Sequence, residues 1–445
     1  MNEKIYIDFY KEFVQKIKEN SVDYLNRNRD SAFENFEKKG FPADKDEQYR
    51  YSRLASTLSI DFGLNINRLK FQIDKNILYR CKIPSINSVS AFMVNDNFYF
   101  PENQKLSLPQ GIVFCPLSDA EKFYPKVVKK YLFSQSKKSE DSFTNFNSAF
   151  VQDGYFLYIQ QNTVFEHPLQ LINLLHCAQP LMTFAHNLIV VESGAAAKML
   201  LCEHAADDID FFASRITEIF VENNAKFEYY SLENTNRKTN ISSQIFVNQK
   251  DNSNVVINSV GLNNAVSRNS VFADIDGQHS ELFLGGMLIS DGNQETENFT
   301  LIRHKQPNSV SNELFKYILD EKSRGIFSGK IIVEKDAQRT QSRQTNKNIC
   351  LTEEAVIHSR PQLEIYADDV KCGHGATTGQ LDNCALFYLQ SRGISKDEAQ
   401  LMLLAAFVQD VLENINIEVL RERLTLMVEK RLKKDSYHCR DCFIC

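Results

Sequence analysis

The spacing of apolar residues divides the chain into a helical beginning, a β-rich middle and a helical end. Over residues 1–60, apolar side chains recur at intervals near three or four, which is the spacing of one face of an amphipathic helix. Gly40 and Pro42 are expected to close this segment, because both residue types interrupt a helix. Residues 61–150 are mixed, with short apolar runs and one further predicted helix over 119–133.

From residue 151 the pattern changes to short segments rich in β-branched and aromatic residues and bounded by Asn, Asp, Gly or Ser. A long series of short strands is typical of a sandwich, a barrel or a β-helix. A region of this length is large for a sandwich, whereas stacked coils can extend indefinitely because each coil needs only its neighbours. No exact repeat is present, so the sequence predicts an irregular β-helix over 151–382.

After Asp382 the helical spacing returns. Ser395 begins the second of three predicted helices, and Glu398 follows three residues later, which is the pattern of a capping box. The third helix ends in a basic turn that includes Arg431, where positive charge suits the helix dipole. The predicted fold is therefore mainly β with helical flanks.

The length of 445 residues also predicts more than one structural unit. We expect an N-terminal mixed region, a β-helix core, a helical region and a Cys-rich tail, over residues 1–150, 151–382, 383–434 and 435–445. The first residues show no basic segment followed by an apolar one, and no apolar run reaches the length of a membrane span. We therefore expect a cytoplasmic chain that does not enter a membrane.

The net charge and the cysteine content indicate which partners and which cysteine chemistry to expect. Asp and Glu number 57 and Lys and Arg number 51, which gives a net charge of -6. An acidic surface repels a phosphate backbone, so nucleic acid is not an expected partner. In the cytoplasm, the ten cysteines are expected to be thiols or metal ligands rather than disulfides.

Residues 324–332 look at first like a phosphate loop. Gly325 and Gly329 are separated by three residues, whereas a Walker A loop has four. Ile331 follows Lys330, where that loop requires Ser or Thr, and the segment leads into a predicted strand instead of a helix. We therefore expect a turn into a strand here and no nucleotide binding.

Cys372 and His374 are the most interesting candidates for chemistry. They stand two residues apart in a predicted strand, so their side chains point to the same face. Thiolate and imidazole together suit iron, zinc or copper. Two ligands do not complete a tetrahedral site, so further ligands must come from elsewhere, including another chain. The alternative is that Cys372 faces the core, as many free cysteines do.

The last residues form a second candidate. Cys439, Cys442 and Cys445 have the spacing Cys-x2-Cys-x2-Cys, with His438 beside them. Ligands of iron–sulfur clusters occur at this spacing, although the usual fourth cysteine is missing. The sequence leaves open whether this tail contacts a metal or is an oxidisable end of the chain.

The stretch "PQLEIYADDVKCGHGATTGQLDNCALFYLQSRGIS" resembles the signature of the SufB/SufD family, which belongs to the Suf machinery for iron–sulfur cluster assembly. Three further stretches are similar to family segments: "GFPADKDEQYRYSRL", "NSAFVQDGYFLYIQQNTVFEHPLQL" and "ELFKYILDEKSRGIFSGKIIVEKDAQRTQSRQTNKNICL". The resemblance covers most of the chain and is strongest from about 300 to 415.

Two departures favour the SufD branch of this family. Gly373 and Gly375 flank His374, whereas SufB-like chains have glutamate there. The stretch from Gln344 to Asn348 lacks the cysteine that SufB-like chains carry. Both differences also imply that this chain alone is not the main holder of a cluster.

The resemblance implies a right-handed parallel β-helix and two partners. The β-helix would pair with a SufB-like subunit, and the C-terminal helices would bind the ATPase SufC. We expect the ATPase contact to include Arg392, Gly393, Ser395 and Glu398. ATP-driven closure of two SufC copies would strain the pair and open a site at its interface. His374 matches the histidine implicated at that interface, and Cys372 lies in the same motif.

The sequence therefore predicts a non-catalytic scaffold subunit with no tightly bound cofactor, at whose partner interface iron or an iron–sulfur cluster is held transiently. Two alternatives remain open. One is a homodimer that binds or delivers iron through the Cys-rich tail. The other is a β-helix enzyme acting on carbohydrate, which needs paired carboxylates along one groove. Asp368 and Asp369 are adjacent, so on a strand they would point to opposite faces.

Overall fold

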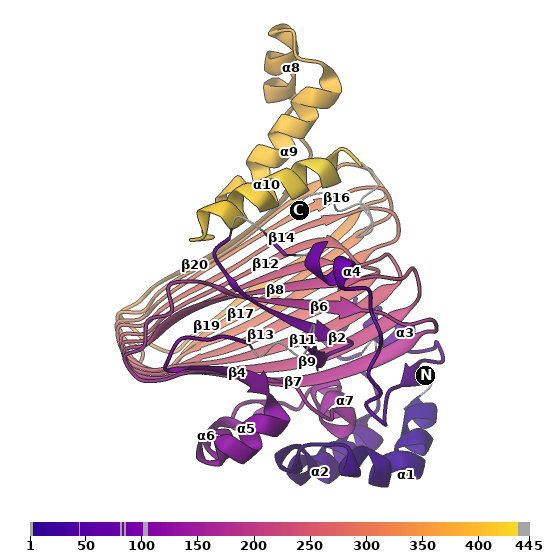
Figure 1. The fold of residues 1–445 in the computed structure, drawn as a ribbon. Coiled ribbons are helices and arrows are strands. Elements are labelled where there is room, and N and C mark those ends of the chain that lie inside the picture. Colours follow the sequence, from indigo (N-terminus) through magenta and orange to yellow (C-terminus); the bar gives the residue numbers. More distant parts are fainter. Residues whose placement is uncertain (1–2, 44, 81, 84–85, 101–105, 435–445) are drawn as a thin grey trace.

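The computed structural model describes residues 3–434, apart from residues 44, 81, 84, 85 and 101–105. Its centre is a β-solenoid, in which each turn of the chain adds one strand to each of two facing sheets, here called sheet A and sheet B (Figure 1). Each sheet has 10 strands, and the solenoid has about 8 turns. The predicted mainly β fold with N-terminal and C-terminal helices is confirmed.

The two sheets interleave along the sequence. Sheet A contains, in spatial order, β4 (Ile112–Pro116), β5 (Tyr155–Ile159), β7 (Leu181–Val191), β9 (Phe211–Val221), β11 (Thr239–Gln249), β13 (Val266–Ile275), β15 (Glu295–His304), β17 (Arg324–Val333) and β19 (Val356–Ile365), with β1 (Gly63–Leu64) beside β7. Sheet B contains β3 (Asn97–Tyr99), β2 (Val89–Val94), β6 (Leu169–Leu175), β8 (Ala196–Ala205), β10 (Lys226–Asn234), β12 (Asn254–Asn263), β14 (Glu281–Ser290), β16 (Val310–Leu319), β18 (Gln341–Cys350) and β20 (Lys371–Gly379). Within the turns the strands pair in parallel, and only β2–β3 and β4–β5 pair in antiparallel fashion among the described strands.

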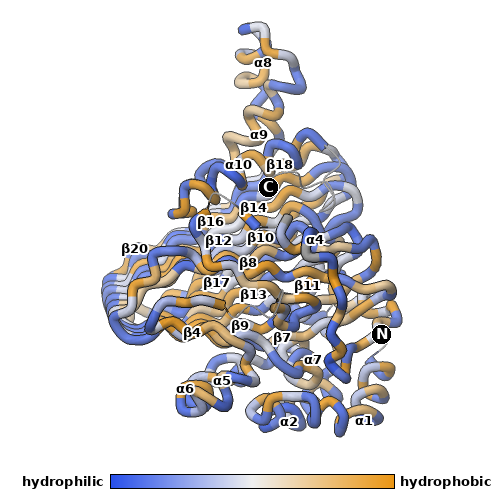
Figure 2. Tube along the Cα trace, in the orientation of Figure 1, coloured by the Kyte–Doolittle hydropathy of each residue, from blue (hydrophilic) through white to orange (hydrophobic). Residues whose placement is uncertain are grey.

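Alternate residues of each strand point into the solenoid, and the others point outward. The inner apolar side chains stack from turn to turn and form one continuous core. Most strand positions are apolar, whereas the corners between the sheets are hydrophilic (Figure 2). Strands such as β7 and β9 are buried along nearly their whole length, because helices cover their outer face as well. This explains why the sequence shows short apolar runs instead of a clean alternation.

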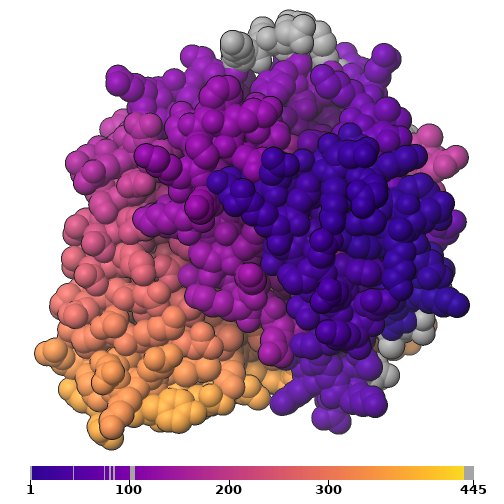
Figure 3. Space-filling view, turned by 90° about the horizontal axis from the view of Figure 1, so that it is seen from below, coloured from indigo at the N-terminus to yellow at the C-terminus, as the bar shows by residue number. Residues whose placement is uncertain are grey.

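Helices cover part of the outer face of each sheet. They are α1 (Glu3–Glu19), α2 (Asp23–Lys39), α3 (Leu54–Thr57), α4 (Lys75–Arg80), α5 (Leu117–Phe123), α6 (Pro125–Tyr131), the 3-10 helix Ser136–Lys138, α7 (Ser142–Phe150), α8 (Asn383–Ser391), α9 (Lys396–Leu412) and α10 (Glu418–Leu432). The first helices and α7 pack on sheet A, and α9 and α10 pack on sheet B. From below, the N-terminal residues cover much of the visible face of the molecule (Figure 3). None of the described helices is long and apolar enough to cross a membrane.

The observed helix boundaries agree with the predicted ones at Gly40 and differ from them at Pro125. Gly40 has a left-handed backbone and its N–H donates to the carbonyl of Phe36, so it ends α2 as predicted. The single helix predicted over 119–133 is wrong, because two short helices, α5 and α6, occupy this stretch. Proline has no N–H to continue a helix and is preferred at a first helical position, so a new helix starts at Pro125.

The stretch that resembled a phosphate loop is a strand throughout, β17, and no helix follows it. The predicted turn is therefore absent, while the predicted strand is present. A Cβ atom at Gly325 would lie 2.8 Å from the side chain of Tyr317, and one at Gly329 would lie 2.3 Å from Gln344. Both glycines therefore serve the packing of the solenoid interior.

Candidate functional site

His374 lies on β20, the last strand of sheet B, and its neighbours fix which way it faces. In the register of the sheet, Gln344 of β18 pairs with His374, and Glu313 of β16 pairs with Gln344. Glu313 has the same strand parity as Phe315, which belongs to the inner core. His374 therefore lies on the inner face of the solenoid wall, and it is exposed because no further turn covers it.

Cys372 shares this face, as the sequence predicted, but its surroundings differ. It is half-buried and packs against the apolar core of the solenoid. Burial raises the pKa of its thiol, against a weaker opposing effect of a backbone hydrogen bond with Ser342. A neutral, partly covered thiol is a poorer metal ligand than the open imidazole of His374. The structure thus brings the two side chains to one face but gives only His374 free access to solvent.

The end of the solenoid at β19 and β20 is open. Among the described residues, β20 pairs only with β18, and β19 pairs only with β17, so both strands leave one edge without hydrogen bonds. Apolar side chains of the last turn are exposed with these edges, including Val356, Ile365 and Tyr366, of which Tyr366 is 62% exposed. An open edge with apolar side chains beside it is a surface suited to pairing with another chain.

A groove of about 470 Å³ runs along β18 and β20 beside His374. Three basic residues line it, Arg343, Lys347 and Lys371, and their strand parity places their side chains on the outer face of the wall, opposite the imidazole of His374. No ion pair joins any of these three to a carboxylate of the described residues. The groove is therefore positively charged, and it favours a surface or ligand with net negative charge.

The described residues do not complete a metal site by themselves. No group of three His, Cys, Asp or Glu side chains within the described part of the chain has the geometry to hold a metal ion. The predicted tail ligands Cys439, Cys442 and Cys445 lie outside the described residues, so their role stays a prediction. Any metal bound at His374 therefore needs ligands from another source.

The residues predicted for the ATPase contact lie together, well away from the core of sheet B. Ser395 caps α9 by accepting a hydrogen bond from the N–H of Glu398, as the capping box predicted. Arg392 and Gly393 form the turn between α8 and α9, where Gly393 has a left-handed backbone. In Figure 1, α8 and the start of α9 project from the solenoid.

Sequence reasoning missed two aromatic side chains beside this turn. Phe387 and Tyr388 on α8 are 73% and 57% exposed. Arg392 lies over the ring of Tyr388, with 5.2 Å from the guanidinium carbon to the ring centroid. Exposed aromatic residues on a projecting helix are typical of a protein–protein contact. Their spacing alone did not distinguish them from a buried helix face.

Arg431 lies in the last turn of α10, as predicted, and it also makes contacts that the sequence did not indicate. Its guanidinium is buried, forms an ion pair with Asp291 at 2.8 Å and donates to the carbonyl of Leu262 at 2.7 Å and to the side chain of Gln294 at 3.0 Å. Burial opposes ionisation of Asp291, but the hydrogen bond and charge of Arg431 lower its pKa overall. Arg431 therefore fixes the end of α10 to the solenoid.

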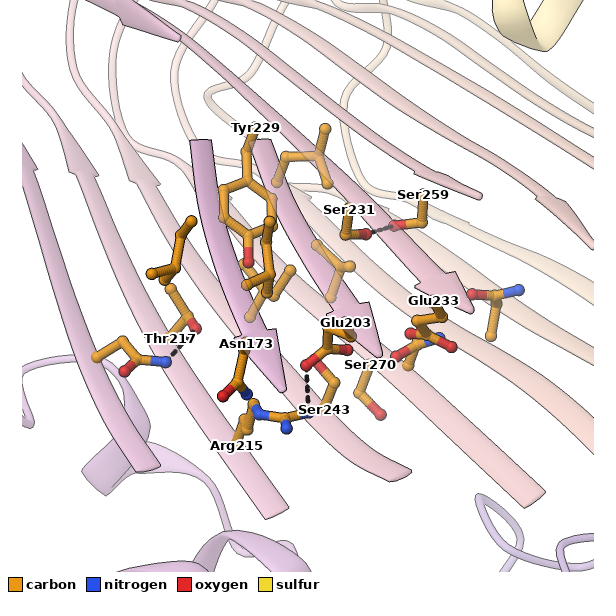
Figure 4. A pocket seen from close by; sticks show the side chains of 18 of the residues that line it. Asn173, Glu203, Arg215, Thr217, Tyr229, Ser231, Glu233, Ser243, Ser259 and Ser270 are labelled. Atoms are coloured by element: carbon orange, nitrogen blue, oxygen red, sulfur yellow. Dashed lines mark hydrogen bonds and ion pairs between the residues drawn. The ribbon is translucent and has the colours of Figure 1, made fainter. Parts of the chain in front are cut away.

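The interior of the solenoid contains an acidic cluster around a small cavity of about 30 Å³ (Figure 4). Glu203 and Glu233 lie on neighbouring strands in register, and Arg215 forms ion pairs with Glu203 and, at 2.8 Å, with Asp96. The cavity has room for about two water molecules and none for a sugar. These carboxylates do not provide the open acidic groove that a carbohydrate-active enzyme needs.

The predicted strand position of Asp368 and Asp369 is wrong. Both residues lie in the corner between β19 and β20, outside either strand. The N–H of Asp369 donates to the side chain of Gln338, and its carbonyl accepts from the N–H of Arg339. They act as corner residues that join one turn of the solenoid to the next, and strand parity does not apply to them.

Comparison with known families agrees with this architecture. Residues 1–171 match the family described as SufBD protein N-terminal region, and residues 174–407 match the family described as SUF system FeS cluster assembly, SufBD core domain. The chain belongs to the SufBD family. SufBD proteins take part in iron–sulfur cluster assembly, and the resemblance found in the sequence is thereby confirmed. The core match includes both the His374 groove and the turn between α8 and α9.

Three SufBD relatives show how far the similarity extends. A SufBD family protein of Synechocystis is 27% identical over 400 residues, covering 88% of this chain and 87% of the relative. SufD of Escherichia coli is 30% identical over 249 residues, covering 56% of this chain and 59% of the relative. SufD of Bacillus subtilis is 27% identical over 338 residues, covering 73% and 75%. The two relatives with a subunit name are both SufD, which agrees with the branch favoured by the sequence.

Proposed function

We propose that this SufBD chain is a non-catalytic scaffold subunit that pairs with a SufB-like subunit through the open end of its solenoid and presents His374 to the shared interface. The observation that carries this proposal is the position of His374 on the last turn, exposed on the inner face and beside two unpaired strand edges. The site is open on the side where a partner would complete it.

Strand addition explains how the partner would attach. A neighbouring chain with a matching edge can continue sheet A beyond β19 or sheet B beyond β20, so that its backbone satisfies the unpaired N–H and C=O groups. The apolar side chains of the last turn, such as Ile365 and Tyr366, would be covered at the same time. A second copy of this chain offers the same edges, so a homodimer is the expected state when the SufB-like subunit is absent.

Ligand chemistry explains why the site needs the partner. Imidazole is a good ligand for iron, but one imidazole leaves at least three tetrahedral positions unfilled. Thiolates from the partner would fill them. Iron or a nascent cluster would then be cargo at the interface and not a resident cofactor of this chain.

The C-terminal helices supply the second proposed contact. The projecting α8, with Phe387 and Tyr388, and the turn at Arg392 form an exposed surface that suits the ATPase partner. The chain itself has no phosphate loop in its described part, since the one candidate stretch is the strand β17. ATP hydrolysis in the complex would therefore belong to the partner.

A co-expression experiment tests the proposal. The chain is produced with SufB-like and SufC-like partners and purified without oxygen, and cluster content is measured by absorption spectroscopy. We expect His374→Ala to leave the complex intact and to lower cluster content at least tenfold. Thr377→Ala is the matched control, because Thr377 lies on the same strand as His374 but on the opposite face. Wild-type cluster content in the His374→Ala complex would refute the assignment of the site.

A further inference from the structure

The row of inner side chains that ends at His374 continues into the buried part of the solenoid. Glu313, Gln344 and His374 follow one another in register on β16, β18 and β20, and all three point to the inner face. Glu313 and Gln344 are fully buried, whereas His374 is exposed at the open end. Strands in a sheet lie about 4.8 Å apart, so each side chain is within reach of the next.

The buried side chain of Gln344 is held in one orientation. Its Nε2 donates to a carboxylate oxygen of Glu313 at 2.5 Å. Its amide also packs against Gly329 on the facing sheet, where a Cβ atom would come within 2.3 Å of Nε2. The glycine thus leaves the space that the amide occupies, and Glu313 determines which end of the amide points inward.

The other end of this amide is left without a partner. The Oε1 atom of Gln344 is buried and accepts no hydrogen bond from any described residue. The neighbouring Asn346 shows the contrast, because its Oδ1 accepts hydrogen bonds from both Ser359 and Asn348 at 2.7 Å. A buried carbonyl oxygen without a donor is costly, so a nearby donor is expected to turn toward it.

We propose that Gln344 is a positioning residue for His374: its free carbonyl oxygen accepts the N–H of the imidazole and so fixes which ring nitrogen keeps a lone pair for a metal. His374 is in the adjacent register position on the same face, and its imidazole makes no hydrogen bond within the described part of the chain. Rotation of its exposed side chain is enough to bring an N–H to Gln344. Metal-binding histidines commonly have their second nitrogen held in this way.

This arrangement gives Glu313 and Gly329 a role as well. Glu313 binds the donor end of the Gln344 amide, so the acceptor end stays free for the imidazole. Thr300 also contacts the Glu313 carboxyl group from the facing sheet. Glu313 and Gln344 together would thus hold the imidazole of His374 in one orientation before iron binds. Such preorganisation lowers the entropic cost of binding iron there.

The inference rests on the proposed role of His374, but its test needs neither partner nor cluster. The full chain is labelled with ¹⁵N in histidine, and the tautomer ratio of His374 is read from long-range ¹H–¹⁵N correlation spectra, with His374→Ala to assign the signals. We expect the ratio to differ about fivefold from that of a short histidine peptide under the same conditions, the bias that one hydrogen bond supports. A ratio equal to that of the peptide would overturn the proposal.

Two variants distinguish a positioning role of Gln344 from a general effect on packing. Gln344→Met removes the acceptor at nearly constant volume and should return the ratio to that of the peptide. Thr345→Val, on the same strand but the opposite face, should leave it unchanged. A Gln344→Met ratio equal to that of the wild type would contradict the inference.

A gain-of-charge variant covers the case in which Gln344→Met does not fold. Gln344→Glu keeps an acceptor oxygen, so the tautomer ratio of His374 should keep the bias of the wild type. The basic side chains Arg343, Lys347 and Lys371 are present in every variant and do not account for a difference between them. A ratio equal to that of the peptide would place Gln344 out of reach of the ring. Loss of cluster assembly in His374→Ala is a separate result, because it reports on the interface and not on the tautomer.

Discussion

Lys316 of β16 and Asp410 of α9 form an ion pair that joins the projecting helical region to the solenoid. The Lys316 side chain is buried, and its Nζ also donates to the carbonyl of Phe407 at 2.6 Å. Asn258 adds a third bond by donating to the carbonyl of Val411 at 2.8 Å. The base of α9 is thus fixed to sheet B, while α8 and the start of α9 stand free of it (Figure 1). The attachment point of α9 is thus on β16, the strand that also carries Glu313.

The first prediction concerns this attachment. Lys316→Met should lower the free energy of unfolding by about 1–2 kcal/mol, because it removes hydrogen bonds to a charged group but leaves Asp410 partly solvated. Hydrogen exchange measured by mass spectrometry should increase in residues 396–412. Lys330→Met is the matched control, since Lys330 forms an exposed ion pair with Glu364 on the other sheet. Equal exchange in the two variants would show that the ion pair does not hold α9.

The second prediction concerns the exposed aromatic residues of α8. Phe387→Asp and Tyr388→Asp should each weaken binding of the ATPase partner at least tenfold, because aromatic anchors contribute most of the affinity of a protein interface. The folding of the chain should be unaffected, since both side chains are largely exposed. Affinity is measured by calorimetry with the purified partner. Leu426→Asp on α10 serves as the control, because Leu426 is 51% exposed but lies on another helix. If the three variants bound alike, the ATPase contact would have to lie elsewhere.

Local patterns were sufficient to predict several elements from the sequence. The series of short apolar segments predicted stacked coils, because the formation of each strand and each corner is determined by residues close together in the sequence. Ser395 and Glu398 predicted the start of α9 for the same reason. The alternation of side chains placed Cys372 and His374 on one face, but their different exposure depends on where the last turn ends.

Contacts between distant residues could not be predicted in the same way. Lys316 and Asp410 are 94 residues apart, and no periodicity indicates that they meet. The pairing of Gln344 with His374 depends on the length of the chain from β18 through β19 to β20, which sets the register. Arg431 looked like an ordinary charged residue at a helix end until the fold placed Asp291 beside it. Register and long-range packing were therefore available only from the structure.

The third prediction concerns the open end of the solenoid. Tyr366→Asp should weaken pairing with the SufB-like subunit about tenfold or more, since it puts a charge into an apolar surface that the partner would cover. Phe123→Asp is the control, because Phe123 is also exposed but lies on α5, away from the last turn. Pairing is measured by analytical ultracentrifugation of the mixed subunits. Normal pairing by Tyr366→Asp would argue against the last turn as the interface.

The fourth prediction concerns the acidic cluster inside the solenoid. Burial, together with the charge of Glu203, raises the pKa of Glu233 from 4.5 to about 7, although Asn269, Arg215 and Asn264 act in the opposite direction. Between these two pH values the folded protein keeps a proton that the unfolded chain releases. The free energy of unfolding should therefore fall as the pH rises from about 4.5 to about 7, and should level off above that range.

Replacing the carboxyl group by an amide removes this titration. Glu233→Gln should therefore be more stable than the wild type at pH 8, by on the order of 1–3 kcal/mol, and its stability should depend less on pH. Urea unfolding at pH 5 and pH 8 measures both quantities. Glu281→Gln, at an exposed position of β14, should keep the pH dependence of the wild type. A Glu233→Gln variant that loses stability between pH 5 and pH 8 as steeply as the wild type would show that another group is responsible, because the amide cannot titrate in this range.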